Sequence, residues 1–168
     1  MQIPEGDNRE RFVCEGCHRI HYVNPRIVAG CIPLWEGKVL LCRRAIEPQK
    51  GLWTIPGGFM EQNERVEEAA MRETLEEAGA TVELTRLQCV YSIPHISQVY
   101  LVFVGNLIDG VFAPGIESLE TVLFSVEDIP WDELDFSAIR FSLEKYVEHL
   151  GSGQEAPHLG ACVKDVGY

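Results

Sequence analysis

The sequence feature that most constrains this chain is a run of acidic residues that follows a glycine turn. Residues 64–78, ERVEEAAMRETLEEA, have the pattern of a helix and lie between Pro56-Gly57-Gly58 and Gly79. Asn63 is a suitable N-cap, and Gly79 suits the left-handed position just past the end of a helix. We therefore expect a helix over residues 64–78, close behind a glycine turn.

Three carboxylates of this helix share one face. Because each helical residue turns by about 100 degrees, Glu73, Glu76 and Glu77 project within an arc of roughly 100 degrees. A solvated charged face is the simpler interpretation. Against it, like charges on adjacent turns repel one another unless a cation binds, and Mg²⁺ prefers carboxylate oxygens. The cluster favours a metal site, and the other side of the helix is expected to pack into the core through Met71, Leu75 and Ala78, with Thr74 at its margin.

The spacing around these acids resembles the signature of the Nudix hydrolases. That signature carries Gly, Glu, Arg-Glu, Glu-Glu and Gly at the separations found here for Gly58, Glu64, Arg72-Glu73, Glu76-Glu77 and Gly79. Thr74 departs from the pattern, because the family usually carries an aliphatic residue at this packing position. The resemblance extends, less sharply, from about Arg26 to Leu150.

This resemblance implies an α/β fold, an α/β/α sandwich with a mixed sheet, in which a loop-helix-loop binds Mg²⁺ or Mn²⁺. It assigns the metal to Glu73 and Glu77, assisted by Glu76 and by the backbone carbonyl of Gly58. Glu64 and Arg72 are implied to orient the acids. The expected catalytic set is therefore Glu64, Arg72, Glu73, Glu76 and Glu77.

Residues outside the signature are expected to contact the substrate. The family often supplies a further carboxylate from beyond the signature, and Glu117 and Glu120 are the candidates, with exposed loop acids as the alternative. Arg43 and Arg44 follow an apolar strand, where arginines either grip phosphate or stay solvated. We expect Arg43 and Arg44 near the substrate, and Trp53 in the core.

The expected substrate class rests on a weaker resemblance than the signature does. The region YSIPHISQVY lacks the Ser-Gln-Pro-Trp-Pro-Phe-Pro run of NADH pyrophosphatases, and its surroundings look closer to the FAD and ADP-ribose pyrophosphatases. A nucleoside diphosphate linked to another moiety, with ADP-ribose or FAD favoured and AMP released, is the expected substrate. The alternatives are a nucleoside triphosphate pyrophosphatase and a regulator that binds nucleotides without cleaving them, against which the intact acidic set argues.

The rest of the chain divides into strands, one more helix and two flanking segments. A hairpin is expected over 26–35 and 38–44 around Glu36-Gly37, followed by strands near 52–56, 80–93, 98–108 and 120–126. A helix over 136–150 is expected to bury Ile139, Leu143, Val147 and Leu150. We therefore predict a Nudix domain over 26–150, preceded by a partial zinc-ribbon-like segment, 1–25, and followed by a flexible extension, 151–168.

The N-terminal segment contains half of a zinc motif. Cys14 and Cys17 have C-x2-C spacing, but a structural zinc site needs four ligands and no second pair is present. His18 and His21 are candidates to complete a local Cys/His set, although their closeness in sequence disfavours good tetrahedral geometry. The segment resembles the second half of the zinc ribbon of some Nudix proteins, with Met1 where the first pair is expected, as in a truncated or mis-started chain. Zn²⁺ at Cys14 and Cys17 stays an open alternative.

Charge and hydropathy limit the classes of partner expected for this chain. Acidic residues outnumber basic ones 26 to 14, for a net charge of −12, which opposes binding to nucleic acid or to an anionic membrane. No apolar run is long enough to span a bilayer, and the first residues lack a signal-peptide core. We expect a cytoplasmic protein with a small nucleotide substrate, a homodimer by family resemblance, and reduced core thiols at Cys31, Cys42 and Cys89.

Overall fold

A mixed β-sheet lies at the centre of the computed structural model, which describes residues 1–152 and 157–162. In this part of the chain the sheet has eight strands, in the order β10-β7-β8-β3-β4-β5, with β6 paired to β3 and β9 paired to β4. The strands are β3 (Arg26–Trp35), β4 (Lys38–Arg44), β5 (Trp53–Thr54), β6 (Gly57–Phe59), β7 (Val82–Ile93), β8 (Gln98–Leu107), β9 (Ser118–Phe124) and β10 (His158–Ala161).

Strand β3 lies in the middle of the sheet and is buried on both faces. It runs parallel to β8 and antiparallel to β4 and β6. Successive side chains of a strand point to opposite faces. Accordingly Val28 and Ile32 pack into one core cluster, while Ala29 and Cys31 pack on the other side of the sheet. This explains why β3 reads as a continuous apolar run rather than as an alternating one.

The β3–β4 hairpin has the bounds expected from the sequence. Glu36 and Gly37 form its turn, and both have positive φ, 48° and 75°. Two central residues with positive φ match the right-handed twist of the flanking strands, which is why such turns join hairpins. Trp53 is buried in the core as expected and meets Phe124 edge to face at 5.0 Å between ring centroids.

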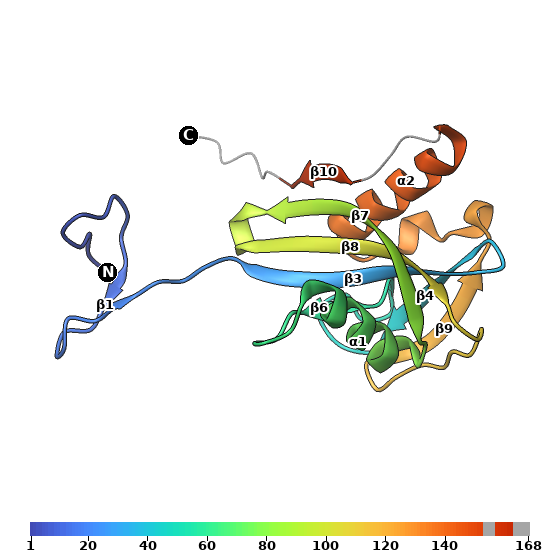
Figure 1. The fold of residues 1–168 in the computed structure, drawn as a ribbon, viewed down its shortest axis with the longest axis horizontal. Helices are drawn as coiled ribbons and strands as arrows, with labels where there is room; N and C mark the ends of the chain where they lie inside the picture. Colours follow the sequence, from blue (N-terminus) through green and yellow to red (C-terminus); the bar gives the residue numbers. More distant parts are fainter. Residues whose placement is uncertain (153–156, 163–168) are drawn as a thin grey trace.

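Two helices cover the two faces of the sheet, as Figure 1 shows: α1 (Val66–Ala78) and α2 (Ser137–Ser152). The expected α/β sandwich with a mixed sheet is confirmed. Helix α2 buries Ile139 and Leu143 as expected, but Leu150 is 58% exposed. The expectation that Leu150 is buried is wrong, because the last turn of α2 points away from the sheet (Figure 1).

Part of the expected C-terminal extension forms a strand. Residues His158–Ala161 form β10, which pairs in parallel with residues 89–92 of β7. Gly160 allows a close approach, because a Cβ there would lie 2.7 Å from the ring of Phe141. The pairing satisfies backbone groups at the edge of β7 that would otherwise face solvent. Residues 153–156 and 163–168 of the extension lie outside the described residues.

The N-terminal segment forms a separate two-stranded hairpin. Strands β1 (Phe12–Val13) and β2 (Ile20–His21) pair with each other, and Figure 1 shows them beside the main body at the end of an extended connection. The remaining elements are the short 3-10 helices η1 (Pro94–Ile96), η2 (Val126–Asp128) and η3 (Trp131–Glu133). Within residues 1–152 and 157–162, no helix has the length and apolar character needed to cross a membrane.

Candidate active site

Two glycines at the start of β6, where the chain turns out of β5, lie against neighbouring segments of the chain. The backbone N–H of Gly57 donates a hydrogen bond of 2.9 Å to Oε2 of Glu77. A Cβ at Gly58 would lie 2.6 Å from the carboxylate carbon of Glu73. A Cβ at Gly57 would lie 2.8 Å from the Cα of Gly30 in β3. The turn therefore needs glycine at both positions because its neighbours approach so closely.

Helix α1 begins later than the sequence suggested. Its first residue is Val66 and its N-cap is Arg65, whose N–H donates to Oε2 of Glu68 at 2.8 Å. The expectation of an N-cap at Asn63 is wrong: Asn63 has a φ of 65° and lies in the preceding turn. Glu64 stays outside the helix because its carboxylate is held elsewhere. The C-terminal end matches expectation, with Gly79 left-handed at a φ of 57°.

The buried stripe of α1 differs from the one expected. Thr74 is fully buried and its hydroxyl donates to the carbonyl of Ala70 at 2.7 Å, whereas Leu75 is 55% exposed. The expectation that Leu75 anchors the helix is wrong, because the stripe follows the i, i+4 row of Ala70, Thr74 and Ala78. Glu73 and Glu77 flank this row instead of facing away from it. Two of the three acids thus lie where the helix meets the sheet.

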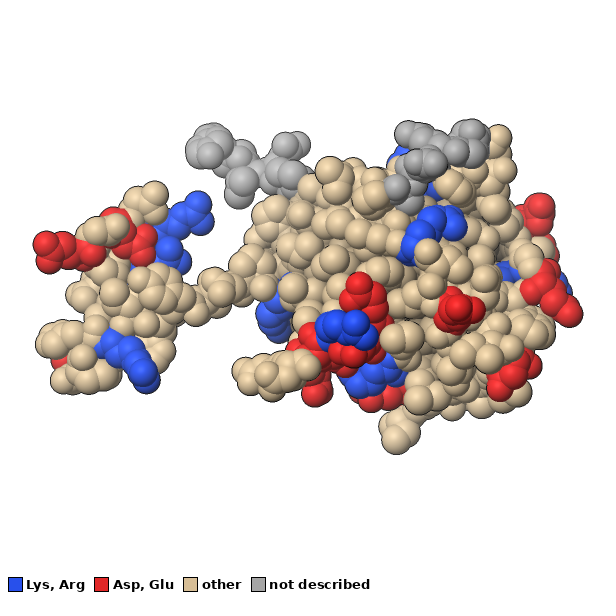
Figure 2. Space-filling view, viewed as in Figure 1, with Lys and Arg blue, Asp and Glu red and all other residues tan. Residues whose placement is uncertain are grey.

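Arg72 links the acidic residues into one network. Its guanidinium makes two hydrogen bonds with Glu64, at 2.8 and 3.1 Å. It also donates to Oε1 of Glu73 at 2.6 Å, to Oε2 of Glu76 at 3.1 Å and to the carbonyl of Phe59. Figure 2 shows acidic and basic side chains side by side over α1. The geometry is the one expected for residues that orient the acids, a role that stays a prediction.

Burial and like charge raise the pKa of two of the acids. The pKa of Glu77 rises to about 7, first because of burial, with the charges of Glu73 and Glu117 adding to the rise, while the N–H of Gly57 opposes it. Burial is also the largest cause of the raised pKa of Glu73, opposed by the hydrogen bond from Arg72. In contrast, the hydrogen bond from Arg72 lowers the pKa of Glu64.

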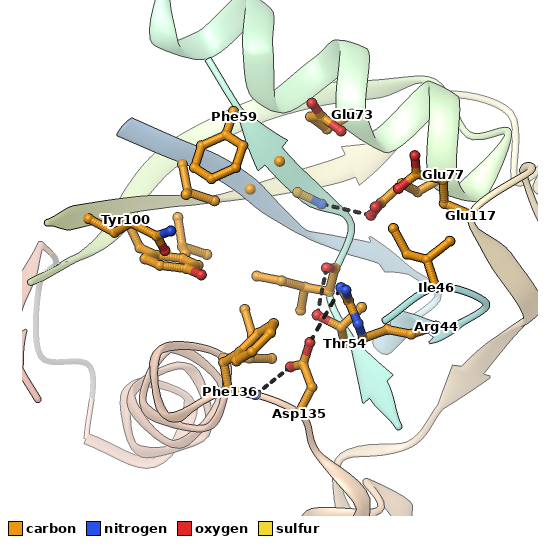
Figure 3. Close-up of a pocket in the computed structure, with 18 of the residues that line it drawn as sticks. Arg44, Ile46, Thr54, Phe59, Glu73, Glu77, Tyr100, Glu117, Asp135 and Phe136 are labelled. Carbon is orange, nitrogen blue, oxygen red and sulfur yellow. Dashed lines mark hydrogen bonds and ion pairs between the residues drawn. The ribbon is translucent and has the colours of Figure 1, made fainter. Parts of the chain in front are cut away.

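Glu73, Glu76 and Glu77 line a cavity of about 1070 Å³. Figure 3 shows Glu73, Glu77 and Glu117 together on one side of it. Asp135 and Phe136, just before α2, lie on the opposite side, and Arg44 lies between the two sides. The cavity therefore has an acidic end and, across from it, a second end with its own carboxylate.

The structure separates the four substrate-site candidates into two pairs. Arg44 and Glu117 line the cavity. Arg43 instead donates to Oε1 of Glu120 at 3.0 Å and to the carbonyl of Gly51 at 2.7 Å. Neither Arg43 nor Glu120 lines the cavity, so the structure does not bring them to the acidic end. Consecutive residues of a strand point to opposite faces, which explains why only one of the two neighbouring arginines faces the cavity.

Several cavity residues gave no signal in the sequence. Asp135 stands in EDIPWDELDF, among acids that mostly lie at the surface, and its side chain is fully buried. Phe136 directly precedes α2, and Phe59 directly follows the glycine turn. Both line the cavity, yet an apolar residue beside a helix or a turn reads as ordinary packing. Only the fold shows that these side chains face a common space.

The acidic end of the cavity carries donors of the type that a divalent cation prefers. Four carboxylates line the cavity at one end, those of Glu73, Glu76, Glu77 and Glu117. A cation would offset the burial and the like charges that raise the pKa of Glu77. Within residues 1–152 and 157–162, no three acidic, His or Cys side chains lie close enough together to hold an ion. Arg72 supplies positive charge to Glu73 and Glu76 in this structure. The residue types therefore suit a hard cation such as Mg²⁺.

The cysteines fall into two classes. Cys31, Cys42 and Cys89 are buried, and burial raises the pKa of the first two to about 12, which makes them inert core thiols as expected. In the N-terminal hairpin, hydrogen bonds from the backbone of Cys17 and Gly16 lower the pKa of Cys14. The described residues place no third metal ligand beside Cys14 and Cys17. Zinc binding there stays an alternative from the sequence.

Comparison with known proteins gives matches over most of the chain. The family model described as NUDIX domain matches residues 24–145, and the model described as Nudix N-terminal, a zinc-ribbon family, matches residues 1–23. A crystal structure of a Nudix hydrolase from Nitrosomonas europaea is 55% identical, with a TM-score of 0.93, over 97% of this chain and 93% of that one. The matches include both the main body and the N-terminal segment.

Two curated relatives carry names that concern chemistry. The ADP-ribose pyrophosphatase of Methanocaldococcus jannaschii is 34% identical over 115 residues, which is 65% of this chain and 67% of the relative. The NAD-capped RNA hydrolase NudC of Chromobacterium violaceum is 30% identical over 123 residues, 73% of this chain and 43% of the relative. Both relatives are named for cleaving nucleotide-containing compounds.

Proposed function

Because the chain belongs to the Nudix family and is a hydrolase of that family, we propose that it cleaves the pyrophosphate of a nucleoside diphosphate linked to another moiety, with Mg²⁺ or Mn²⁺ as cofactor. ADP-ribose and FAD are the favoured substrates, and AMP is the common product. The observation that carries this proposal is the two-ended cavity of about 1070 Å³, acidic at one end and lined by apolar residues at the other. Such a cavity suits a nucleotide whose phosphates and base need different surroundings.

The acidic end is the proposed site of metal binding. Glu73, Glu76 and Glu77 and the carbonyl of Gly58 would hold the cation, because hard cations select oxygen ligands. When bound, the metal supplies charge neutralisation at the two phosphates and a bound water of lowered pKa. Arg72 holds Glu73 and Glu76 in place through hydrogen bonds of 2.6 and 3.1 Å. Glu64 fixes Arg72 in turn by its two hydrogen bonds.

Two further residues of the cavity are proposed to act on the substrate. Arg44 faces the space between the acidic end and Asp135, and its guanidinium would donate hydrogen bonds to a phosphate oxygen there. Glu117 would be the carboxylate from beyond the signature, because its charge contributes to the raised pKa of both Glu73 and Glu77. Of the two acids considered from the sequence, the proposal keeps Glu117.

The favoured substrate draws support from the first relative. The protein of Methanocaldococcus jannaschii is named an ADP-ribose pyrophosphatase, and two thirds of its length aligns with this chain. ADP-ribose and FAD share the adenosine diphosphate half, so the same cavity can take either. A homodimer and a cytoplasmic location stay predictions from the sequence.

A substrate panel tests the proposal. The full chain is incubated with ADP-ribose, FAD, NADH and deoxynucleoside triphosphates, each with Mg²⁺ or Mn²⁺, and AMP and phosphate products are quantified. Metal-dependent release of AMP from ADP-ribose or FAD is expected. Faster turnover of the triphosphates would replace the proposal with the triphosphate alternative. If no compound is cleaved while calorimetry detects nucleotide binding, the chain is a nucleotide-binding regulator. A chain with Glu77→Gln is the control for contaminating hydrolases.

A further inference from the structure

A buried carboxylate with an unused oxygen lies at the end of the cavity opposite the acidic set. Asp135 stands between η3 and α2, and its side chain is 0% exposed. Its Oδ1 accepts a hydrogen bond of 2.7 Å from the backbone N–H of Phe136. Its Oδ2 has no hydrogen-bond partner, although the atom is buried. A charged oxygen left in this state is unfavourable unless another group pairs with it.

The neighbouring donors do not satisfy this oxygen. Nη1 of Arg44 is 3.8 Å away, which is beyond hydrogen-bond distance. The Nε of Arg44 donates to the carbonyl of Pro48 at 2.9 Å. The hydroxyl of Thr54 donates to the carbonyl of Ile55 at 3.1 Å, and it also lies within hydrogen-bonding reach of the Asp135 carboxylate, whose pKa it lowers. In this arrangement no described residue makes a hydrogen bond to Oδ2 of Asp135, so the oxygen can accept one from a ligand.

The walls around Asp135 are apolar and partly aromatic. Ile55, Val102 and Ile139 line the cavity together with Phe136 and Tyr100. These side chains also belong to, or pack against, the core cluster that α2 covers, which fixes their positions. Burial is the main reason why the pKa of Asp135 rises to about 6. The space thus suits a flat apolar ring that carries a hydrogen-bond donor on one edge.

We propose that this end of the cavity is a nucleobase subsite, in which Oδ2 of Asp135 accepts an N–H from the amino group of the base. The inference rests on the proposed function, because it places the phosphates at the acidic end and adenine at the other. Arg44, between the two ends, would then lie beside the phosphates. Asp135 would be a specificity residue: a base without a donor on that edge leaves the buried oxygen unpaired.

A second explanation is that Asp135 serves only to position Arg44. The two side chains are close enough for charge attraction, and the guanidinium of Arg44 lies 5.4 Å from the ring centroid of Phe136. In that case the loss of Asp135 would weaken the binding of all nucleotides by the same factor, because they share the phosphate that Arg44 would contact. Recognition of the base would instead change the ratio between two nucleotides that differ only in the base.

Calorimetry with AMP and purine riboside 5′-monophosphate separates these explanations, because the two nucleotides differ only in the amino group. The wild-type chain, with Mg²⁺ present, is expected to bind AMP about tenfold more tightly, as a hydrogen bond to a charged group provides. In Asp135→Ala this preference should fall to nearly one. Asp132→Ala, which removes an exposed acid of the preceding helix η3, is the matched control and should keep the tenfold preference.

Results from either the wild-type chain or the Asp135→Ala chain can overturn the inference. The base subsite is refuted if the wild-type chain does not prefer AMP, or if the Asp135→Ala chain keeps the preference. An equal loss of affinity for both nucleotides in Asp135→Ala would show that Asp135 only positions Arg44. If the alanine variant does not fold, AMP labelled with ¹⁵N in its amino group is bound to the wild-type chain. Amino protons shifted downfield support the hydrogen bond, and unshifted ones refute it. A base preference that depends on Asp135, in a chain that hydrolyses neither ADP-ribose nor FAD, would refute the proposed function alone.

Discussion

Glu77 and Gly57, twenty residues apart in the chain, are joined by a hydrogen bond of 2.9 Å from the backbone N–H of the glycine to Oε2 of the acid. The bond ties the last turn of α1 to the first residue of β6. It also opposes the rise in the pKa of Glu77 that burial causes. The carboxylate is therefore held in a fixed position while its negative charge stays only partly compensated, which is the state that a bound cation would relieve.

Glu77→Gln tests whether that charge is needed. The amide keeps the size of the side chain and an oxygen that can accept from Gly57, so the fold and the melting temperature should be preserved. Activity with Mg²⁺ should fall on the order of 100-fold or more, because charge stabilisation by a metal is worth several kcal/mol in a transition state. Steady-state kinetics and thermal denaturation measure the two effects. Near-normal Mg²⁺-dependent turnover would remove Glu77 from the metal site.

The glycine turn offers a matched pair of substitutions. Gly58→Ala would place a Cβ 2.6 Å from the Glu73 carboxylate, which is the free end of a side chain and can move aside. Gly57→Ala would place one 2.8 Å from the Cα of Gly30, which is backbone and cannot. We expect Gly57→Ala to lower the free energy of unfolding by about 2 kcal/mol. Gly58→Ala should chiefly lower kcat; urea denaturation that shows equal losses for both would contradict this.

The neighbouring arginines should behave differently on substitution. Arg44 lines the cavity, so Arg44→Ala should lower kcat/KM about tenfold or more through the loss of a charged hydrogen bond to phosphate. Arg43 pairs with Glu120 at 3.0 Å, and both side chains are well exposed. Such a pair contributes little to stability. Arg43→Ala should therefore stay within about twofold of the wild type in kinetics, and the opposite order would reverse the assignment.

The sequence predicted the parts of the site that one local segment contains. Arg72, Glu73, Glu76 and Glu77 lie within two turns of a single helix, so their spacing alone indicated that they would meet. The end of the helix at Gly79 was likewise predictable, because it depends only on the left-handed conformation of that one residue. Local spacing did not fix which side of α1 is buried: Leu75 and Thr74 differ by one step, and the packing against β3 decided between them.

The substrate side of the cavity depends on contacts between distant segments, which no local pattern contains. Alternation along β4 separates Arg43 from Arg44, but which of the two faces the cavity depends on where β4 lies in the sheet, between β3 and β5. Asp135 reaches the cavity only because the chain after β9 returns to the sheet, where the N–H of Asp135 donates to the carbonyl of Trp53 at 3.0 Å. An acid in a polar stretch of sequence gives no sign of such burial.

The pH dependence of stability gives a test of the burial of Asp135. Its pKa rises from 3.8 to about 6 in the folded chain, mainly through burial. A raised pKa of an acid means that folding favours the protonated form, so this group destabilises the fold progressively as the pH rises from about 4 through 6. The shift corresponds to roughly 3 kcal/mol above pH 6. Asp135→Asn, which mimics the protonated acid, should match the wild type near pH 4 and exceed its free energy of unfolding at pH 7. Urea denaturation at the two pH values measures the difference, and a constant gap between the two chains would show that the carboxylate is solvated.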